Sequence, residues 1–589
     1  MTSFSTPTLT TTDKVALGRE VPNGKIILLA TLGGAAIGTT VAGIRFCVGF
    51  IQTIFFGTDV NLNAASIAPW RLMAVILPGS LLLGLLLVLA GRFNRLAIVD
   101  PVEANALEGG KMSFIDSLIL VGLSAVSITI GGSVGFEAAM TQLGAGTLSA
   151  IGQRLKLPRS DLRILVSCGT GAGIAAIFGA PLAGAFYALE LVIGGYGMRA
   201  LLPTLLASAM SSHAIYMLIS YRPIFLASNL GIPAFWHFPL ALVVGVSAAI
   251  VGIAVMRGTT AFENLLKLVR IPAALKPVIG GLILASISLF IPQVMGPGHH
   301  SIGQILAGYD LIGPTLALLL AKIAASVACV GSGFRGGLFS TSLFMGAALG
   351  CLIHGLLIVP VLGSQAPLDL TVIAGMAGVA TSIIGTPIAI VLLTLETAGL
   401  QVGVVTTAIT VVIANYLTRY WFGYSFSTWR FHVRGNDLSS PRDIGRLRSL
   451  KFADLKLINP LRVTPNHSIS ELLPLLETTN QIIAVEEHNR FIGFIRAQHL
   501  LASATTNPRL PLDKLIEKPS CVHATDSLAQ HIESNKENFM NELVVLDNKE
   551  QLLGYTTEAI VLRRYLEEIL TLDREDANAP LVNLPNKSI

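Results

Sequence analysis

The sequence predicts an α-helical polytopic membrane protein whose membrane domain is followed by a soluble α+β domain. Hydrophobic residues make up 52% of the 589 residues and charged residues only 13%, a composition typical of multi-pass membrane proteins. The charge is unevenly distributed, because the chain becomes rich in Asp, Glu, Lys and Arg from about Arg430 onward. Two stretches within the apolar part also resemble each other, which indicates an internal duplication.

The change in composition sets the expected domain boundaries. Residues 1–25 are polar and Thr-rich, lack a signal-peptide pattern, and are expected to be a disordered lead-in. We expect a membrane domain over residues 26–435, a linker over 436–449, a soluble domain over 450–572 and a tail over 573–589. The net charge of +5 gives no case for nucleic acid. The five cysteines show neither metal spacing nor a disulfide framework, which favours structural thiols and no metal site.

The apolar segments differ in length. Ile26 to Ile44 and Leu72 to Ala90 can each span a bilayer, whereas many later apolar runs are short and interrupted by Gly or Pro. Such discontinuous helices occur where backbone lines a cavity or binding site. The loop from Gln153 to Arg163 carries four cationic residues, so we expect it on the cytoplasmic side, with the chain returning to that side at Arg199.

An internal repeat supports the same view. The stretch from Cys168 to Glu190 recurs from Ala374 to Glu396, and each copy has Gly-x-Pro followed nine residues later by Glu. Chance matches of Ala, Gly and Leu are common in apolar sequences, but this pairing is not. A second pair of similar stretches begins at Gly132 and Gly331. Two inverted repeats with broken helices predict a substrate site at their interface, near the membrane midplane.

One carboxylate stands out in this setting. Glu137 is the only charged residue between Asp116 and Arg154, and glycines precede it. A lone carboxylate at membrane depth marks an ion or proton pathway by default. At a helix N-terminus its charge would be stabilised by free N–H groups, which could bind an inorganic anion if the side chain swung away. This suggests a gate; the alternative is a structural N-cap carboxylate paired with a distant Arg.

Together these segments resemble the CLC family of chloride channels and chloride/proton antiporters, over about residues 26–435. Gly135–Phe136–Glu137 resembles the family's Gly-Arg-Glu-Gly-Pro segment, and Gly336 to Phe339 resembles its Gly-x-Phe-x-Pro segment. The stretch from Gly179 to Glu190 is similar to the family's most constant region, and Gly423 to His432 to the start of its last membrane helix. The resemblance implies a homodimer with one pore per subunit, in a bacterial inner membrane, with the C-terminal domain cytoplasmic.

The resemblance also implies which residues bind and gate the anion. Glu137 takes the position of the gating glutamate, and the implied anion-binding positions are Gly135, Phe136, Glu137, Leu338, Phe339, Ile98 and Phe426. Two of these depart from the family pattern, because Ile98 replaces a Ser and Phe426 replaces a Tyr, with Tyr424 two residues away. Both side-chain hydroxyls of the family's central site are then missing, so backbone N–H groups would have to hold the anion.

A third departure concerns protons. In many family transporters a proton-accepting Glu follows the position of Glu190, but here that residue is Leu191. Leucine cannot carry a proton, so we expect chloride transport that is passive or weakly proton-coupled. A fully coupled antiporter is the alternative; an intramembrane enzyme or an organic-solute carrier is a remote one. The repeat mate Glu396 favours a structural role for Glu190, as an acceptor of backbone hydrogen bonds.

The soluble part repeats itself as well. Each unit ends with an apolar strand, a short turn and a second strand, from Ile482 to Ile495 and from Glu542 to Thr556. This resembles a tandem CBS pair, which can bind adenine nucleotides. The usual ribose-binding Asp is replaced by His499 and Ile560, so we expect dimer contact or gating coupling rather than nucleotide binding.

Two further features have open interpretations. The pair His299–His300 has poor geometry for a metal, which favours a loop role. Arg335 has no other charged residue between Lys322 and Asp369. It either raises the local anion concentration near the pore or forms an ion pair, for example with Asp100.

Overall fold

The structure is a computed structural model that divides into two units, residues 1–442 and 443–589. It describes residues 24–58, 66–93, 99–219, 236–307, 312–362, 368–398, 403–433, 450–476, 482–487, 490–506, 511–518, 520–534, 542–547 and 550–577. The division falls within the segment predicted as a linker, 436–449, which lies outside the described residues, as does most of the predicted lead-in.

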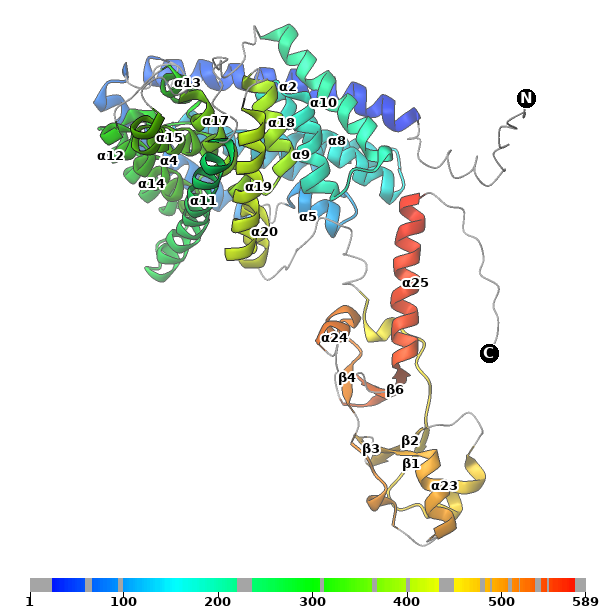
Figure 1. Cartoon of the computed structure of the whole chain (residues 1–589). Helices are drawn as coiled ribbons and strands as arrows, with labels where there is room; N and C mark the ends of the chain where they lie inside the picture. Colours follow the sequence, from blue (N-terminus) through cyan, green and yellow to red (C-terminus); the bar gives the residue numbers. More distant parts are fainter. Residues whose placement is uncertain are drawn as a thin grey trace, which may run out of the picture. The chain divides into compact units, whose positions relative to one another are not determined.

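The first unit is helical throughout its described residues (Figure 1). Its helices are α2 (Gly24–Phe56), α4 (Pro69–Arg92), α5 (Pro101–Ala106), α6 (Phe114–Thr129), α7 (Glu137–Arg154), α8 (Arg159–Phe178), α9 (Pro181–Ala188), η2 (Leu189–Ile193), α10 (Met198–Leu218), α11 (His237–Leu268), α12 (Lys276–Ser288), η4 (Pro292–Val294), α13 (His299–Leu306), α14 (Ile312–Ser332), α15 (Phe339–Ile353), η5 (His354–Ile358), α16 (Val359–Leu362), α17 (Leu368–Ile384), α18 (Pro387–Ala398), α19 (Val404–Trp421) and α20 (Phe426–Val433). Among the described residues, 7 helices are long and apolar enough to cross a membrane, including both of the predicted spans.

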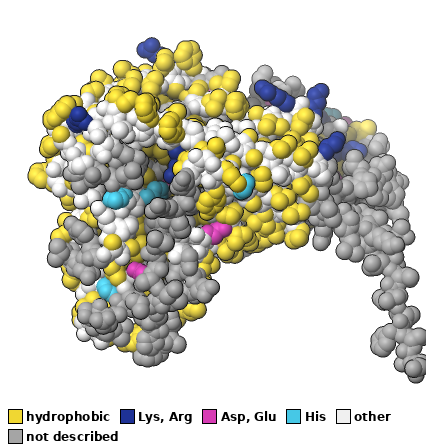
Figure 2. Space-filling model, turned by 90° about the horizontal axis from the view of Figure 1, so that it is seen from above, with side chains coloured by type: hydrophobic (Ala, Val, Ile, Leu, Met, Phe, Trp, Pro, Cys, Tyr) yellow, Lys and Arg dark blue, Asp and Glu magenta, His cyan; other side chains and the backbone are white. Residues whose placement is uncertain are grey.

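Apolar side chains also cover much of this unit's outer surface (Figure 2). Large examples include Phe290, which is 85% exposed, and Phe46, which is 73% exposed. A water-soluble protein would bury such side chains, whereas lipid tails accept them without cost. The first unit is therefore built to sit in a bilayer.

The predicted helix breaks occur in both repeats and have the same cause. Between α8 and α9, Gly179 adopts a left-handed conformation (φ 62°), and Pro181 then opens the next helix. Between α17 and α18, Gly385 does the same (φ 84°), followed by Pro387. Glycine reverses the chain without steric cost, and proline suits the first helical turn because it lacks an N–H.

Glycines also let neighbouring helices approach closely at equivalent places in the two repeats. A Cβ on Gly144 of α7 would overlap the carbonyl of Gly169 on α8, and a Cβ on Gly346 of α15 would overlap that of Gly375 on α17. These contacts fix the position of the N-terminal turns of α7 and α15, because each helix is held against its neighbour at backbone distance.

The cationic loop lies at one end of this helix pair. α7 ends at Arg154 and α8 begins at Arg159. Near the start of α8, Asp161 forms an ion pair with Arg199 at the start of α10, with 2.8 Å between the guanidinium nitrogen and the carboxylate oxygen. The predicted return of the chain to the side of this loop is therefore confirmed.

The second unit contains two three-stranded sheets of identical topology. The first consists of β1 (Leu461–Val463), β2 (Ile482–Glu487) and β3 (Arg490–Arg496), and the second of β4 (Cys521–His523), β5 (Glu542–Leu546) and β6 (Leu552–Thr557). In each sheet the first pair is parallel, the second is antiparallel, and the register shifts near the end of the middle strand. The predicted duplication of the soluble domain is visible in this shared topology.

Helices and 3-10 turns complete both halves of the second unit. They are η6 (Phe452–Asp454), α22 (Ile469–Leu472), η7 (Leu473–Leu475), α23 (Ala497–Thr506), η8 (Leu512–Lys514), α24 (Leu528–Ser534) and α25 (Glu558–Ala577). α25 runs beyond residue 572, where the soluble domain was expected to end. One hydrophobic cluster contains Ile482 and Phe494 from the first half together with Val544 and Tyr555 from the second. The two halves are thus packed into one body.

Candidate functional site

The centre of the first unit is the place where α7 and α15 begin. The chain turns sharply after α6 at Gly131 (φ 84°) and after α14 at Gly333 (φ 110°). The two loops then pair with each other: the Gly135 N–H donates to the Gly337 carbonyl at 2.9 Å, and the Gly337 N–H donates to the Gly135 carbonyl at 2.8 Å. This bridge is antiparallel, as an inverted repeat requires.

This bridge brings two helix N-termini to one point. α7 begins at Glu137 and α15 at Phe339, each two residues after its bridging glycine. The first-turn N–H groups of an α-helix have no partner within the helix, and their dipoles favour negative charge. The meeting point of α7 and α15 is consequently suited to an anion.

The carboxylate of Glu137 occupies that position. Glu137 is only 3% exposed, and its Oε1 accepts a hydrogen bond from the hydroxyl of Ser340 in the first turn of α15. The backbone N–H groups of Glu137 and Ser340 also lie near the carboxylate and favour its charged form. Its Oε2 is buried and has no hydrogen-bond partner in the described part of the chain. The structural alternative, an ion pair with a distant Arg, is not the contact seen.

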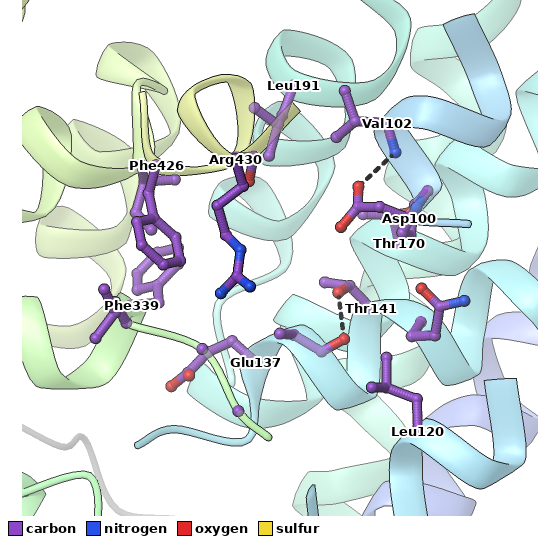
Figure 3. Close-up of a pocket in the computed structure, with 18 of the residues that line it drawn as sticks. Asp100, Val102, Leu120, Glu137, Thr141, Thr170, Leu191, Phe339, Phe426 and Arg430 are labelled. Carbon is purple, nitrogen blue, oxygen red and sulfur yellow. Dashed lines mark hydrogen bonds between the residues drawn. The ribbon is translucent and has the colours of Figure 1, made fainter. Parts of the chain in front are cut away.

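A pocket extends from Glu137 toward the other elements of both repeats (Figure 3). Five of the predicted site residues line it: Glu137, Leu338, Phe339, Phe426 and Leu191. Phe136 is the N-cap of α7, directly before Glu137, and Gly135 forms the bridge. Ile98, the predicted replacement of the family's Ser, lies outside the described residues. The structure therefore brings together the positions that the sequence separates by up to three hundred residues.

Charged side chains line this pocket as well. Arg335 comes from the loop before α15, and Arg430 reaches in from α20 (Figure 3). The Arg430 guanidinium carbon lies 5.7 Å from the ring centre of Phe426. Asp100 caps α5, where its Oδ1 accepts from the Val102 N–H at 2.8 Å. The sequence analysis did not identify Arg430, although its position one helical turn after Phe426 was a usable signal.

Two tyrosines lie near the ends of these helices, and one of them lines the pocket. The Tyr424 hydroxyl lies 3.2 Å from Nδ1 of His432, and the Tyr424 ring stacks on the His432 ring. Tyr424 is not among the lining residues. Tyr187 of α9 does line the pocket, with its ring 5.8 Å from that of Phe339. Tyr187 was missed because nothing in its local sequence marks it.

Glu190 and Glu396 form a reciprocal contact between the repeats. The carboxylate of Glu190 accepts from the N–H groups of Ile388 (3.1 Å) and Ala389 (2.9 Å), at the start of α18. The carboxylate of Glu396, in α18, accepts from the N–H groups of Leu182 and Ala183 at the start of α9, both at 2.8 Å. α9 and α18 lie side by side (Figure 1).

This geometry bears on the proton-relay position. Glu190 also accepts a 3.0 Å hydrogen bond from the Tyr196 hydroxyl, so its carboxylate is directed at α18 and Tyr196. Glu190 does not line the pocket, whereas the neighbouring Leu191 does. The residue facing the pathway at this position is thus apolar.

The histidine pair corrects the expected loop role. His299 and His300 are the first two residues of α13, and Nε2 of His299 lies 3.0 Å from the Ser340 hydroxyl. Among the described residues, no group of three or more His, Cys, Asp or Glu side chains could hold a metal ion.

Two inverted helical repeats that meet at a buried carboxylate, inside an apolar shell, define a membrane protein for small anions. The chain belongs to the voltage-gated chloride channel family, CLC, whose sequence profile matches residues 79–419. A voltage-gated ClC-type chloride channel ClcB of Escherichia coli O81 (strain ED1a) is 30% identical over 407 residues, which cover 67% of this chain and 95% of the relative.

Solved structures agree on the fold. A slow cyanobacterial Cl⁻/H⁺ antiporter has a TM-score of 0.61 at 18% identity and covers 70% of this chain and 98% of its own. A eukaryotic CLC transporter has a TM-score of 0.57 at 14% identity and covers 93% of this chain and 98% of its own. The latter match extends over the soluble unit. The predicted fold, a CLC-type membrane domain followed by a tandem CBS-like domain, is therefore confirmed.

Proposed function

We propose that this protein moves chloride or a similarly small anion across the membrane, through a pathway gated by Glu137, passively or with weak proton coupling. The observation that carries the proposal is the position of the Glu137 carboxylate at the joint N-termini of α7 and α15. A carboxylate and an inorganic anion compete for the same N–H groups. When the side chain swings away, the anion takes its place.

The cationic groups of the pocket support an anion as the substrate. Arg335 and Arg430 both line it, and their positive charge would raise the local concentration of anions. Phe426 offers no hydroxyl at the position where the family has a Tyr. Binding would then depend on the backbone N–H groups and on the two guanidinium groups.

Weak proton coupling is supported by the apolar side chain of Leu191, which lines the pocket. Leu191 can neither carry a proton nor hold the water chain that might replace it, because buried water needs polar partners. The alternative is a fully coupled antiporter, which the cyanobacterial structural relative is said to be. That relative is 18% identical, so its likeness concerns the fold.

The test of the gate is Glu137→Gln. In proteoliposomes the wild-type chloride flux should rise as the pH falls, since protonation removes the charge that competes with the anion. The Gln variant should show a flux that no longer depends on pH. Glu263→Gln is the control, because Glu263 forms an exposed ion pair with Lys267 within α11. Wild-type pH dependence in the Glu137 variant would exclude this residue as the gate.

We also propose a homodimer in a bacterial plasma membrane with the second unit in the cytoplasm, as the resemblance implies. The cationic loop between α7 and α8 supports a cytoplasmic position for that end of the first unit. Cys521 is exposed in the second unit, and the other exposed thiol is Cys47 of α2. In Cys47→Ser, a membrane-impermeant thiol reagent should label Cys521 in inside-out vesicles but not in intact spheroplasts. Labelling of intact spheroplasts, or a monomeric mass in detergent by light scattering, would contradict this arrangement.

A further inference from the structure

A continuous hydrogen-bonded row connects the surface of the first unit to the gate. His299 Nε2 lies 3.0 Å from the Ser340 hydroxyl, which in turn donates to Oε1 of Glu137. A hydroxyl has a single proton to donate. Since Ser340 gives that proton to Glu137, its oxygen must accept from His299, and this fixes the imidazole as the Nε2–H tautomer. All donors of the row thus point toward the carboxylate.

The burial of these groups changes along the row. Ser340 is 0% exposed and Glu137 3%, but His299 is partly exposed and its neighbour His300 is exposed. Nδ1 of His299 has no hydrogen-bond partner within the described ranges. The row therefore has one accessible end, an imidazole nitrogen able to accept a proton, and one buried end, the carboxylate.

The row approaches Glu137 from the side away from the cationic loop. The His299 ring packs edge-on against Phe178, with the ring centres 6.2 Å apart. Phe178 is the last residue of α8, and the cationic loop lies at the first, Arg159. Because positively charged loops face the cytoplasm, His299 is on the external side of the gate. Leu191, by contrast, precedes Arg199, which is bound to the cytoplasmic end of α8.

Two cations act on the His299 ring, and both are fixed in position. Lys322 of α14 is fully buried and donates to the carbonyls of Val294 (2.9 Å) and Gly296 (2.7 Å), just before His299 in the chain. Arg45 of α2 is the other cation. Burial of the ring above all, and then repulsion by these two cations, disfavours a lasting positive charge on the imidazole, so the ring would pass a proton on rather than store it.

The remaining titratable groups of the helices around α13 are more distant. The titratable residue of α15 is Cys351, and that of α17 is Asp369. Gly350 of α15 packs against Thr371 of α17, so both groups lie at the opposite end of α15 from Ser340. Asp369 therefore lies away from the row, and the acid at the buried end of the row is Glu137 of α7.

We propose that His299 and Ser340 form a proton relay, by which the external solution sets the protonation of the Glu137 gate. A proton from external water binds Nδ1, and Nε2 releases its proton to the Ser340 oxygen. Ser340 then passes its own hydroxyl proton to Glu137 Oε1. To reset the relay, the His299 ring swings toward the solvent, where Nδ1 loses its proton to water and Nε2 gains one from water. The ring then returns to Ser340 as the Nε2–H tautomer, and the Ser340 hydroxyl turns back toward Glu137. This inference rests on the gating role proposed above for Glu137.

The relay is tested by the rate at which chloride flux responds to pH. Proteoliposomes with every variant in the Cys47→Ser background are loaded with chloride, and the pH is dropped on one side in a stopped-flow instrument. Labelling of Cys521 gives the fraction in each orientation. We expect His299→Gln and Ser340→Ala to slow the response to an external drop at least about tenfold, since positioned acid–base groups contribute about 10²–10⁴ in rate. The response to an internal drop should be unchanged. His300→Gln, an exposed neighbour on the same helix, is the matched control.

Chemical rescue separates a relay from a structural role. In His299→Gly, free imidazole added outside should restore the fast response, whereas 1,3-dimethylimidazolium, which has no N–H and no free ring nitrogen, should not. An unchanged external response in His299→Gln, or equal slowing for both sides without rescue, would overturn the relay. The gate itself fails only if Glu137→Gln keeps its pH dependence, so the two failures are distinguishable.

Discussion

Removing one carboxylate of the reciprocal contact between α9 and α18 should destabilise the membrane unit more than its partial exposure suggests. Glu396 accepts two hydrogen bonds from the N-terminal turn of α9, and Glu190 does the same for α18. Hydrogen bonds to a charged group contribute about 1.5–3 kcal/mol each. Because Leu182 lies partly at the surface, the lower end applies, and Glu396→Ala should cost about 3 kcal/mol.

The conservative variant separates charge from shape. Glu396→Gln retains one acceptor oxygen but loses the second bond and the interaction with the helix dipole, which together amount to about 2 kcal/mol. The loss should appear mainly as faster unfolding if the contact forms late in folding. Half-lives in detergent at an elevated temperature, followed by the monodisperse fraction in size-exclusion chromatography, should fall about tenfold or more for Gln and further for Ala.

An exposed glutamate outside the α9–α18 contact provides the control for these variants. Glu263→Gln breaks an exposed ion pair in α11 and should change the half-life little, because such pairs contribute about 0–1 kcal/mol. Equal half-lives for Glu396→Ala and Glu263→Gln would refute the view that these carboxylates hold the repeats together. Since Glu190 and Glu396 join the same two helices, the double Gln variant should lose less than the sum of the single losses.

Two further predictions concern transport. Leu191→Glu should introduce or strengthen proton movement. The assay imposes a chloride gradient without a pH gradient and follows the external pH. Robust proton transport in the wild type that this change leaves unaltered would place the proton path elsewhere. Arg430→Gln should lower chloride flux at low ionic strength several-fold while Arg430→Lys retains most of it, because steering by charge is screened by salt; equal flux in both variants at every salt concentration would exclude an electrostatic role.

The sequence predicted the breaks of the helices and the position of Glu137 at a helix N-terminus, because these depend on local chemistry. Gly179 with Pro181, and Gly385 with Pro387, can be recognised without knowledge of their neighbours. The repeat also indicated that Glu190 accepts backbone hydrogen bonds, and its carboxylate does accept them from the first turn of α18. In the soluble unit the strands were recognisable from their apolar runs.

Contacts between distant segments could not be predicted in the same way. His299 reads as a loop residue in its own sequence, and its significance comes from Ser340, 41 residues later. Arg430 and Tyr187 face the pocket only because α20 and α9 bring them there. In the second unit, Arg496 takes a position usually held by Thr, and its ion pair with Glu542 (3.1 Å) joins the two halves. Pairings of this kind depend on tertiary packing.

The bridge between Gly135 and Gly337 joins equivalent positions of the two repeats, so it shows where the repeats become different. Two residues after these glycines the repeats differ, since one carries Glu137 and the other Phe339. Two copies of one architecture, facing opposite ways, would on their own make a passage with no preferred direction. A single acid on one copy and a benzyl group on the other make the two sides of this meeting point chemically unequal.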